Sequence, residues 1–422
     1  MPPQAGSAHF TDALKIPDIR RFLAAVGFFT LAGRSLFVII GFQVWRITQS
    51  PAALGWLGLI EAIPAITLVP FGGYIADHFN RRKVILITRS ASIVCALCLA
   101  FLSRQDHGAP IAGLYAMIFL AGVARAFADP ANTAFEAQVV PKPLTVNASS
   151  WITSTWISCA VIGPAVIGFI FDIWGAGRSY WLIAVLFMLS WLCTAAIAPR
   201  PTPKPEKKEP FLKSLGVGWH FVLNNQMLLG AMALDLFAVL FGGAVALLPI
   251  YADKILHVGG KGLGLLNAAP SMGALIITLM ATHRPPIARA GRNLLLAVAG
   301  FGVSIFVFAF SKHFGVSMAA LFFSGVFDGV SMVIRRSMIR LLSPDHLRGR
   351  IAAANWVFIA ASNELGAFES GMIASWIGTV PCVAVGGLIT LGVVALTAAL
   401  SPKLRQLSFD SRTLELAKNP LS

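Results

Sequence analysis

The sequence predicts an all-α membrane protein with twelve transmembrane helices, arranged as two pseudo-symmetric six-helix bundles. Three observations predict this fold: the composition, the lengths of the apolar stretches and an internal repeat. Hydrophobic residues make up 57% of the 422 residues and charged residues only 12%, with a mean hydropathy of +0.76. A soluble chain of this size needs far more charge to cover its surface, so an ordinary soluble enzyme is excluded.

The apolar stretches define the expected spans. Each bilayer crossing takes roughly 20 apolar residues, whereas a strand of an outer-membrane barrel takes only about ten. The stretches in this chain have the length of helices. We expect spans at 22–47, 53–76, 84–103, 111–139, 147–171, 179–198, 227–252, 262–282, 293–311, 315–341, 351–376 and 379–400. An even number of spans places both chain ends on the same side of the membrane.

The distribution of Lys and Arg indicates which side that is. If both termini are cytoplasmic, the inner segments hold twenty-two basic residues and the outer edges six. Basic residues collect in loops that stay cytoplasmic, so we expect a multi-pass protein of the bacterial inner membrane with both termini inside. The net charge of +15 has the same cause, and we expect the lipid bilayer and not nucleic acid as its partner.

A proline-rich segment separates the two halves. PRPTPKPEKKEP at 199–210 cannot continue a helix because alternating prolines keep it extended. We therefore expect an N-terminal six-helix bundle at 1–198 and a cytoplasmic linker with an amphipathic helix at 199–226. A C-terminal six-helix bundle at 227–400 and a cytoplasmic tail at 401–422 complete the chain.

An internal repeat relates the two halves. LGLIEAIP at 57–64 matches LGLLNAAP at 263–270, an offset of 206. Three glycines have counterparts at an offset of 203: Gly122 with Gly325, Gly163 with Gly366, and Gly168 with Gly371. Duplicated six-helix halves joined by a cytoplasmic linker are a plan of secondary transporters.

The loop between the second and third spans carries the most specific motif. In GGYIADHFNRRK at 72–83, Gly73 allows close helix approach and Asp77 ends its helix. Arg81 and Arg82 follow where they can pair with Asp77 and reach neighbouring helix ends. This order of residues resembles the signature of the major facilitator superfamily, with Asn80 where that family has a glycine; asparagine also tolerates a left-handed turn.

Two further segments carry the same resemblance. IGPAVIGFI at 162–170, with Gly163, Pro164 and Gly168, is similar to the glycine-proline element of antiporters in that superfamily; a simple packing kink is the alternative. The segment 335–371 is similar to the bacterial exporter branch that includes the enterobactin exporter. The resemblance implies a central cavity lined by the first, fourth, seventh and tenth spans.

Ionisable residues inside spans are candidates for the substrate and proton pathway, because each is costly unless paired or hydrated. Arg34 in the first span and Glu61 in the second lie at similar depth, so they can pair. In the fourth span, Arg125 and Asp129 are four residues apart and can neutralise each other.

The preferred polar site combines Arg125 with Asp235 and Asp328, which lie at similar depth in spans four, seven and ten. Asp235 has no cation on its own helix before Lys254, so we expect it to carry the proton. Glu364 in the eleventh span completes the candidates. The alternative is an ion pair that only stabilises one conformation.

Two charged residues near inner helix ends have other expected roles. Glu136 suits a gate together with the loop motif, and Arg89 is placed to extend to the lipid headgroups. No GxxxxGK[ST] phosphate loop, HExxH motif or ordered cysteine framework is present in the sequence. We therefore expect no catalytic residue, no metal site and no cofactor, and we do not expect an enzyme.

These features predict a secondary active transporter that works by alternating access as a monomer. We expect proton-coupled export of an amphiphilic organic compound, siderophore-like or drug-like. An importer of a small solute or siderophore, or a lysolipid transporter, would use the same fold. A membrane receptor or scaffold without transport is a different class, and the acids Glu61, Asp235 and Asp328 at membrane depth argue against it.

Overall fold

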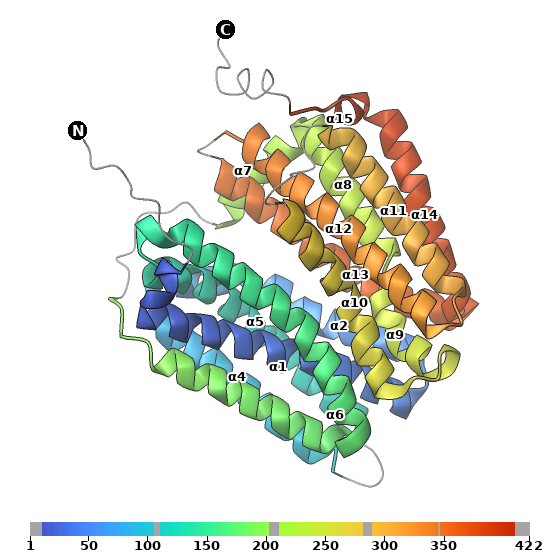
Figure 1. Ribbon diagram of the computed structural model, residues 1–422. Coiled ribbons are helices and arrows are strands. Elements are labelled where there is room, and N and C mark those ends of the chain that lie inside the picture. The colour runs from blue at the N-terminus through green and yellow to red at the C-terminus, as the bar shows by residue number, and fades with distance from the viewer. Residues whose placement is uncertain (1–10, 105–109, 202–210, 282–288, 345–346, 410–422) are drawn as a thin grey trace, which may run out of the picture. The chain divides into compact units, whose positions relative to one another are not determined.

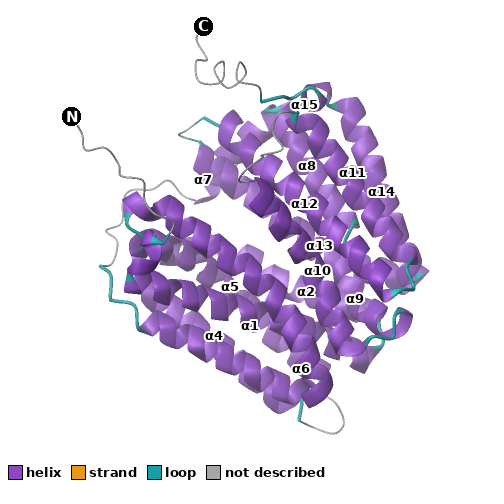
Figure 2. Ribbon diagram, in the orientation of Figure 1, coloured by secondary structure: helices purple, strands orange, loops and turns teal. Residues whose placement is uncertain are grey.

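The computed structural model of the chain describes residues 11–104, 110–201, 211–281, 289–344 and 347–409. All regular elements in these ranges are helices (Figures 1 and 2). The first half contains α1 (Pro17–Thr48), α2 (Pro51–Thr67), α3 (Val69–His78), α4 (Arg81–Leu102), α5 (Ile111–Val139) and α6 (Thr145–Ala195). The second contains α7 (Phe211–Asn224), α8 (Gln226–Phe241), α9 (Leu248–Ile250), α10 (Gly259–Ala281), α11 (Ala290–Phe310), α12 (Phe314–Leu342), α13 (Arg348–Ile377), α14 (Thr379–Leu400) and α15 (Pro402–Arg405).

Nine helices in the described ranges are long and apolar enough to cross a membrane. The number is ten if α2 and the part of α3 from Phe71 to His78, which are bent by 48°, form one span. The 51 residues of α6 pass through Gly175, whose φ of +74° is not helical, so α6 contains the expected span 147–171 and all but the last three residues of 179–198. The full number of twelve spans stays a prediction.

The internal repeat reappears in the helix boundaries. Both α5 and α12 have 29 residues and start at an offset of 203, and α6 and α13 start at the same offset. Gly175 and Gly378, also 203 residues apart, both have positive φ, +74° and +90°. Side chains with a Cβ disfavour this conformation, so glycine ends the preceding helical segment in both halves.

The described residues pack into two compact units. Unit 1 comprises Met1–Gln43 and Ile63–Lys208, and unit 2 comprises Val44–Ala62 and Glu209–Ser422. The segment Val44–Ala62 belongs to unit 2 because α2 packs on α13 there: a Cβ on Gly58 would lie 2.9 Å from the Cβ of Ala367. The bundles at 1–198 and 227–400 and the linker between them stay a prediction, and most of the proline-rich segment lies outside the described residues.

The seventh expected span is interrupted. Sequence analysis expects a continuous helix over 227–252, but α8 ends at Phe241 and is followed by a 3-10 turn at Ala244–Leu247, by α9 and by a π-helix at Tyr251–Ile255. Two glycines follow Phe241, and a Cβ on Gly242 would lie 2.6 Å from the ring of Phe301. Pro249 also has no backbone N–H, so it cannot donate the hydrogen bond of a regular α-helix. Close packing at the glycines and the proline explain the break.

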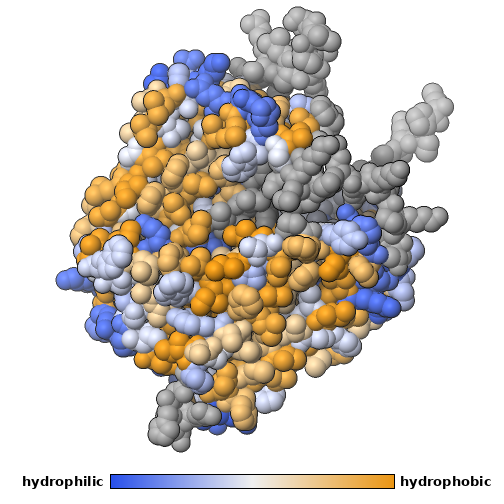
Figure 3. Space-filling model, turned by 180° about the vertical axis from the view of Figure 1, so that it is seen from behind, coloured by the Kyte–Doolittle hydropathy of each residue, from blue (hydrophilic) through white to orange (hydrophobic). Residues whose placement is uncertain are grey.

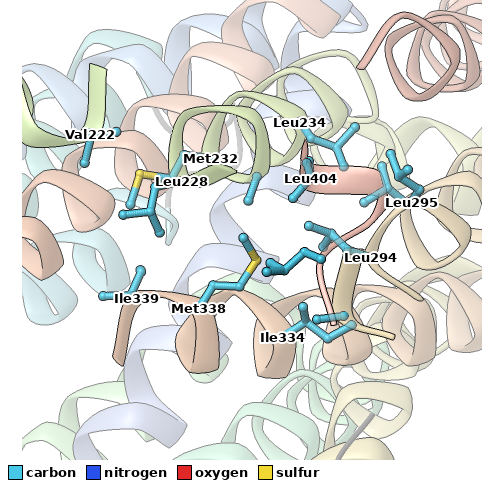
Figure 4. Packing of buried hydrophobic residues seen from close by; sticks show 14 of the residues in the cluster. Val222, Leu228, Met232, Leu234, Leu294, Leu295, Ile334, Met338, Ile339 and Leu404 are labelled. Carbon is cyan, nitrogen blue, oxygen red and sulfur yellow. The ribbon is translucent and has the colours of Figure 1, made fainter. Parts of the chain in front are cut away.

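The buried core of unit 2 joins α8, α11, α12 and α15. Figure 4 shows Leu234, Leu294, Met338 and Leu404 pointing toward one another, and all four are almost fully buried. Elsewhere, large hydrophobic side chains are exposed, among them Ile173 and Trp376, and hydrophobic residues cover much of the face in Figure 3. Such extensive exposed apolar surface is typical of a protein that faces lipid.

Candidate functional site

A buried ion pair connects α8 and α12. Nη1 of Arg335 on α12 donates a hydrogen bond to Oδ2 of Asp235 on α8. The two side chains are only 7% and 9% exposed, and each follows a residue of the unit 2 core, Leu234 or Ile334. Removing either partner would leave a buried charge without compensation, so the pair ties the two helices together.

Asp328 adds a second carboxylate to the same guanidinium. Its Oδ1 lies 3.9 Å from Nη2 of Arg335, and Nε of Arg335 donates to Oγ of Ser331 at 3.2 Å. The side chain of Asp328 is 38% exposed, in contrast to that of Asp235. We call Asp235, Asp328, Ser331 and Arg335 the α8/α12 cluster; the chain covers it least at Asp328.

This geometry adds a partner that the sequence did not indicate for Asp235. Asp235 has no cation on its own helix before Lys254, but Arg335 supplies one from another helix. That Asp235 carries the proton stays a prediction. Sequence analysis missed Arg335 because it searched only the helix that carries Asp235. One signal was available: Asp328 and Arg335 are seven residues apart, two turns of α12, and so share a helix face.

Arg125 and Asp129 form the expected pair within unit 1. Nε of Arg125 lies 3.6 Å from Oδ2 of Asp129, and the side chains are 47% and 43% exposed. The pair is therefore accessible and, unlike the α8/α12 cluster, is not buried. The predicted convergence of Arg125 with Asp235 and Asp328 stays a prediction.

The remaining pathway candidates have local partners. The guanidinium of Arg34 lies 5.4 Å from the ring centre of Trp156 in unit 1, a cation–π contact. Glu61 on α2 and Glu364 on α13 are both half-buried in unit 2. A Cβ on Gly58 would lie 4.0 Å from Oε2 of Glu364, so this carboxylate faces α2. Pairing of Arg34 with Glu61 stays a prediction.

The loop motif joins three helices of unit 1. Nη2 of Arg81 lies 3.9 Å from Oδ1 of Asp77, and its Nε and Nη1 donate to the carbonyls of Ala76 and Ala134 at 3.0 and 3.1 Å. Arg81 therefore connects the end of α3 and the start of α4 with α5. Asn80 does not form a left-handed turn as expected: with φ −65°, it caps α4 by accepting from the amide of Lys83.

Arg82 contacts the end of α6. Its Nε donates to the carbonyl of Thr194 at 3.3 Å, and its Nη2 donates to the carbonyl of Ala195. The last carbonyls of a helix have no partner within the helix and carry partial negative charge, so a guanidinium stabilises them.

Gly72, and not Gly73, allows the close approach of α3 to α5. A Cβ on Gly72 would overlap the carbonyl of Ala126 and lie 3.2 Å from Cα of Phe127, whereas a Cβ on Gly73 would meet no atom within 4 Å. The expectation for Gly73 is therefore wrong by one residue. Glu136, the other gate candidate, accepts a hydrogen bond from Ser149 Oγ at 3.5 Å.

The glycine-proline element packs α6 against α1. A Cβ on Gly163 would lie 3.0 Å from the carbonyl oxygen of Leu31, and Ser35 Oγ donates to the carbonyl of Gly163 at 3.2 Å. Pro164 and Gly168 are buried, and the segment remains helical. The observed role of this element is close packing; its role as a directional gate stays a prediction.

Arg89 does not extend to the membrane surface. It is 2% exposed, donates from Nη1 to the carbonyl of Ser190 on α6 at 2.9 Å, and lies 5.4 Å from the ring centre of Phe29 on α1. The expectation that Arg89 reaches the headgroups is wrong, because its side chain turns into unit 1. In the described ranges, no group of three or more His, Cys, Asp or Glu side chains is arranged to hold a metal ion.

Comparisons with known proteins agree with the fold. The model of the Major Facilitator Superfamily matches residues 23–362. The enterobactin exporter EntS of Shigella boydii serotype 18 (strain CDC 3083-94 / BS512) is 24% identical over 388 residues, 91% of either chain. EntS of Escherichia coli O139:H28 (strain E24377A / ETEC) has the same identity and coverage.

Solved transporter structures share the fold at low sequence identity. The peptide transporter POT superposes with a TM-score of 0.72 and 13% identity, covering 93% of this chain and 95% of that one. The nucleoside transporter NupG gives 0.68 and 12%, covering 92% and 100%. Because the family model spans most of the sequence, this chain belongs to the major facilitator superfamily of membrane transporters.

Proposed function

We propose that the protein exports an amphiphilic organic compound, siderophore-like or drug-like, across the bacterial inner membrane in exchange for protons. It acts as a monomer with both termini in the cytoplasm, and its two halves expose a central site alternately to each side. The observation that carries the proposal is the α8/α12 cluster, a polar centre on the seventh and tenth spans. Export is supported by the similarity to EntS over 91% of the chain.

The unequal exposure of the two acids supports proton coupling. Asp328 is 38% exposed and lies 3.9 Å from Arg335, whereas Asp235 is buried and hydrogen-bonded to it. A proton arriving from solvent meets Asp328 first. Its protonation removes one of the two negative charges that hold Arg335. The contact of Arg335 with Asp328 within α12 then weakens relative to its contact with Asp235 on α8.

The loop motif would control the cytoplasmic side. Arg81 joins α3, α4 and α5, and Arg82 holds the end of α6. Together with Glu136, these contacts suit a gate that stabilises one arrangement of unit 1 during the cycle. The Asp77–Arg81 pair is partly exposed, so it can open without a large loss of stability.

Other cargoes use the same fold. Peptide and nucleoside transporters superpose on the chain about equally well, so the fold does not select the substrate. An importer of a small solute or siderophore, or a lysolipid transporter, is the alternative. The polar centre on α8 and α12 favours transport over a receptor or scaffold function, since a non-transporting protein has no use for acids at membrane depth.

The decisive experiment measures flux in proteoliposomes with an imposed pH gradient. Enterobactin, a dipeptide and a nucleoside serve as cargo, and Asp328→Asn is compared with Lys403→Gln, a change at an exposed position of α15. We expect accumulation of enterobactin in the acidic lumen, lost in Asp328→Asn and kept in Lys403→Gln. Accumulation of the dipeptide or nucleoside alone would refute the proposed class of cargo. Flux that does not depend on the pH gradient would refute proton coupling.

A further inference from the structure

The second half of α12 carries three arginines, of which the α8/α12 cluster uses one. Arg335 is held by Asp235 and Asp328, whereas Arg336 and Arg340 are exposed. In the described part of the chain, no ion pair joins Arg336 or Arg340 to a carboxylate. Among the described residues of this region, three guanidiniums thus share two carboxylates, which leaves them with an excess positive charge.

The two exposed arginines lie one turn apart on one face of α12. Like charges four residues apart on a helix destabilise it slightly, so the sequence retains the pair at a cost. The Arg336 guanidinium is also close enough to Arg335, Arg340 and Asp328 for their charges to interact. Arg336 therefore borders the α8/α12 cluster.

Both arginines of this face are exposed in the part of the chain that the structure describes. Further toward the N-terminus of α12, the same stripe packs on α10: a Cβ on Gly329 would lie 3.1 Å from Cα of Ala274 and 3.2 Å from Cβ of Ile277. Both helices run in the same direction, and α10 ends at Ala281, one turn past Ile277. Arg336 is seven residues past Gly329, about 10 Å along the axis, so it lies past the level of Ala281, the last residue of α10 that the structure describes.

The internal repeat supplies a comparison within the chain. At the offset of 203 that relates α12 to α5, Arg336 and Arg340 correspond to Thr133 and Ala137. Both helices have the same length and end at equivalent positions. A general preference for basic residues at such helix ends would apply to both, so the arginines reflect a requirement specific to unit 2.

We propose that Arg336 and Arg340 form a subsite that binds an oxyanion of the transported molecule. The inference rests on the proposed transport function and specifies its cargo as an organic anion. Guanidinium groups bind carboxylate, phosphate and similar oxyanions through paired N–H donors, and two adjacent groups hold one anion more tightly than one.

Protection from chemical modification tests the subsite without any transport. The purified full-length protein in neutral detergent is treated with phenylglyoxal, which modifies arginine, and modification is quantified peptide by peptide by mass spectrometry. The probes are benzoate and its neutral analogue benzamide, each with and without added phosphatidylglycerol. We expect benzoate to slow modification of Arg336 and Arg340 several-fold, benzamide to have no effect, and exposed Arg405 on α15 to react at the same rate throughout.

Two outcomes of the protection experiment overturn the subsite, and a third separates it from the transport proposal. Equal reaction with benzoate and benzamide means that no oxyanion subsite exists, and protection by phosphatidylglycerol alone assigns the arginines to a lipid headgroup. Protection by benzoate in a protein that moves none of the test cargoes would refute the transport proposal but keep the subsite.

A kinetic comparison then links the subsite to cargo. Arg336→Gln with Arg340→Gln should raise the KM for an anionic cargo about ten-fold, the size expected for losing one charge-assisted hydrogen bond. Arg336→Lys with Arg340→Lys should recover part of this loss, and Arg405→Gln should have no effect. An unchanged KM in the Gln variant at equal folded abundance would exclude a role of the subsite in cargo binding.

Discussion

Arg335 on α12 contacts Asp235 on α8, exactly one hundred residues earlier in the chain, and Asp328 on its own helix. The two contacts differ in kind. The first is a buried hydrogen-bonded ion pair that joins two helices, and the second is a longer contact at a partly exposed carboxylate.

This difference predicts unequal effects of two matched substitutions. Asp235→Asn leaves the buried guanidinium without its close counterion and should lower the free energy of unfolding by about 3–5 kcal/mol. Asp328→Asn should lower it by about 1 kcal/mol or less, because its carboxylate is 38% exposed. Thermal unfolding in detergent measures both, and equal losses of stability would show that the two acids are equivalent.

Asp77→Asn should impair transport without loss of folded protein. The Asp77–Arg81 pair spans 3.9 Å with Asp77 38% exposed, so its contribution to stability is about 1 kcal/mol or less. Arg81→Gln should be more damaging to stability, since Arg81 also donates to Ala76 and Ala134. Transport at the parental rate in Asp77→Asn, at equal membrane abundance, would remove Asp77 from the gate.

Truncation of Arg89 should reduce the amount of folded protein, whereas truncation of Arg125 should reduce transport. Arg89→Ala leaves a void between α4, α1 and α6 and should reduce folded abundance, and Arg89→Met should restore much of it by filling the volume without a charge. Arg125→Ala, at a 47% exposed site, should fold normally and lose transport. Quantitative immunoblots and flux assays separate the two; loss of abundance in Arg125→Ala would contradict this assignment.

A pair of adjacent glycines offers a test of helix packing. Gly72→Ala should force α3 away from α5, because its Cβ would overlap the carbonyl of Ala126, and should reduce both stability and transport. Gly73→Ala should be tolerated, since its Cβ meets no atom within 4 Å. The ratio of folded to aggregated protein in size-exclusion chromatography checks both. Equal behaviour of the two variants would mean that α3 and α5 do not approach at Gly72.

Hydropathy predicts the helices of this chain well where they are uninterrupted. The spans expected at 111–139 and 379–400 coincide with α5 and α14. Breaks depend on what a glycine packs against, so the end of α8 at Phe241, where Gly242 meets Phe301, was not foreseen. Hydropathy averages over a window and carries no information about such contacts.

The candidate site is predictable only within one helix. Arg125 and Asp129 are four residues apart, and the helical period alone brings them together. The partner of Asp235 lies on another helix, and the direction of Arg89 depends on a carbonyl of α6. Depth along a helix can be estimated from sequence, but the direction of a side chain around that helix requires its neighbours.

The grouping of Val44–Ala62 with unit 2 means that the division of the sequence into halves and the division of the molecule by packing are different. A chain cut between α6 and α7 would yield a first fragment whose α2 still carries the glycine face that fits Ala367 and Gly371 of α13. Such fragments, produced separately in one cell, would recognise each other through that face. The covalent connection between the two halves would then make their assembly faster. The fit between α2 and α13 would make the assembly accurate.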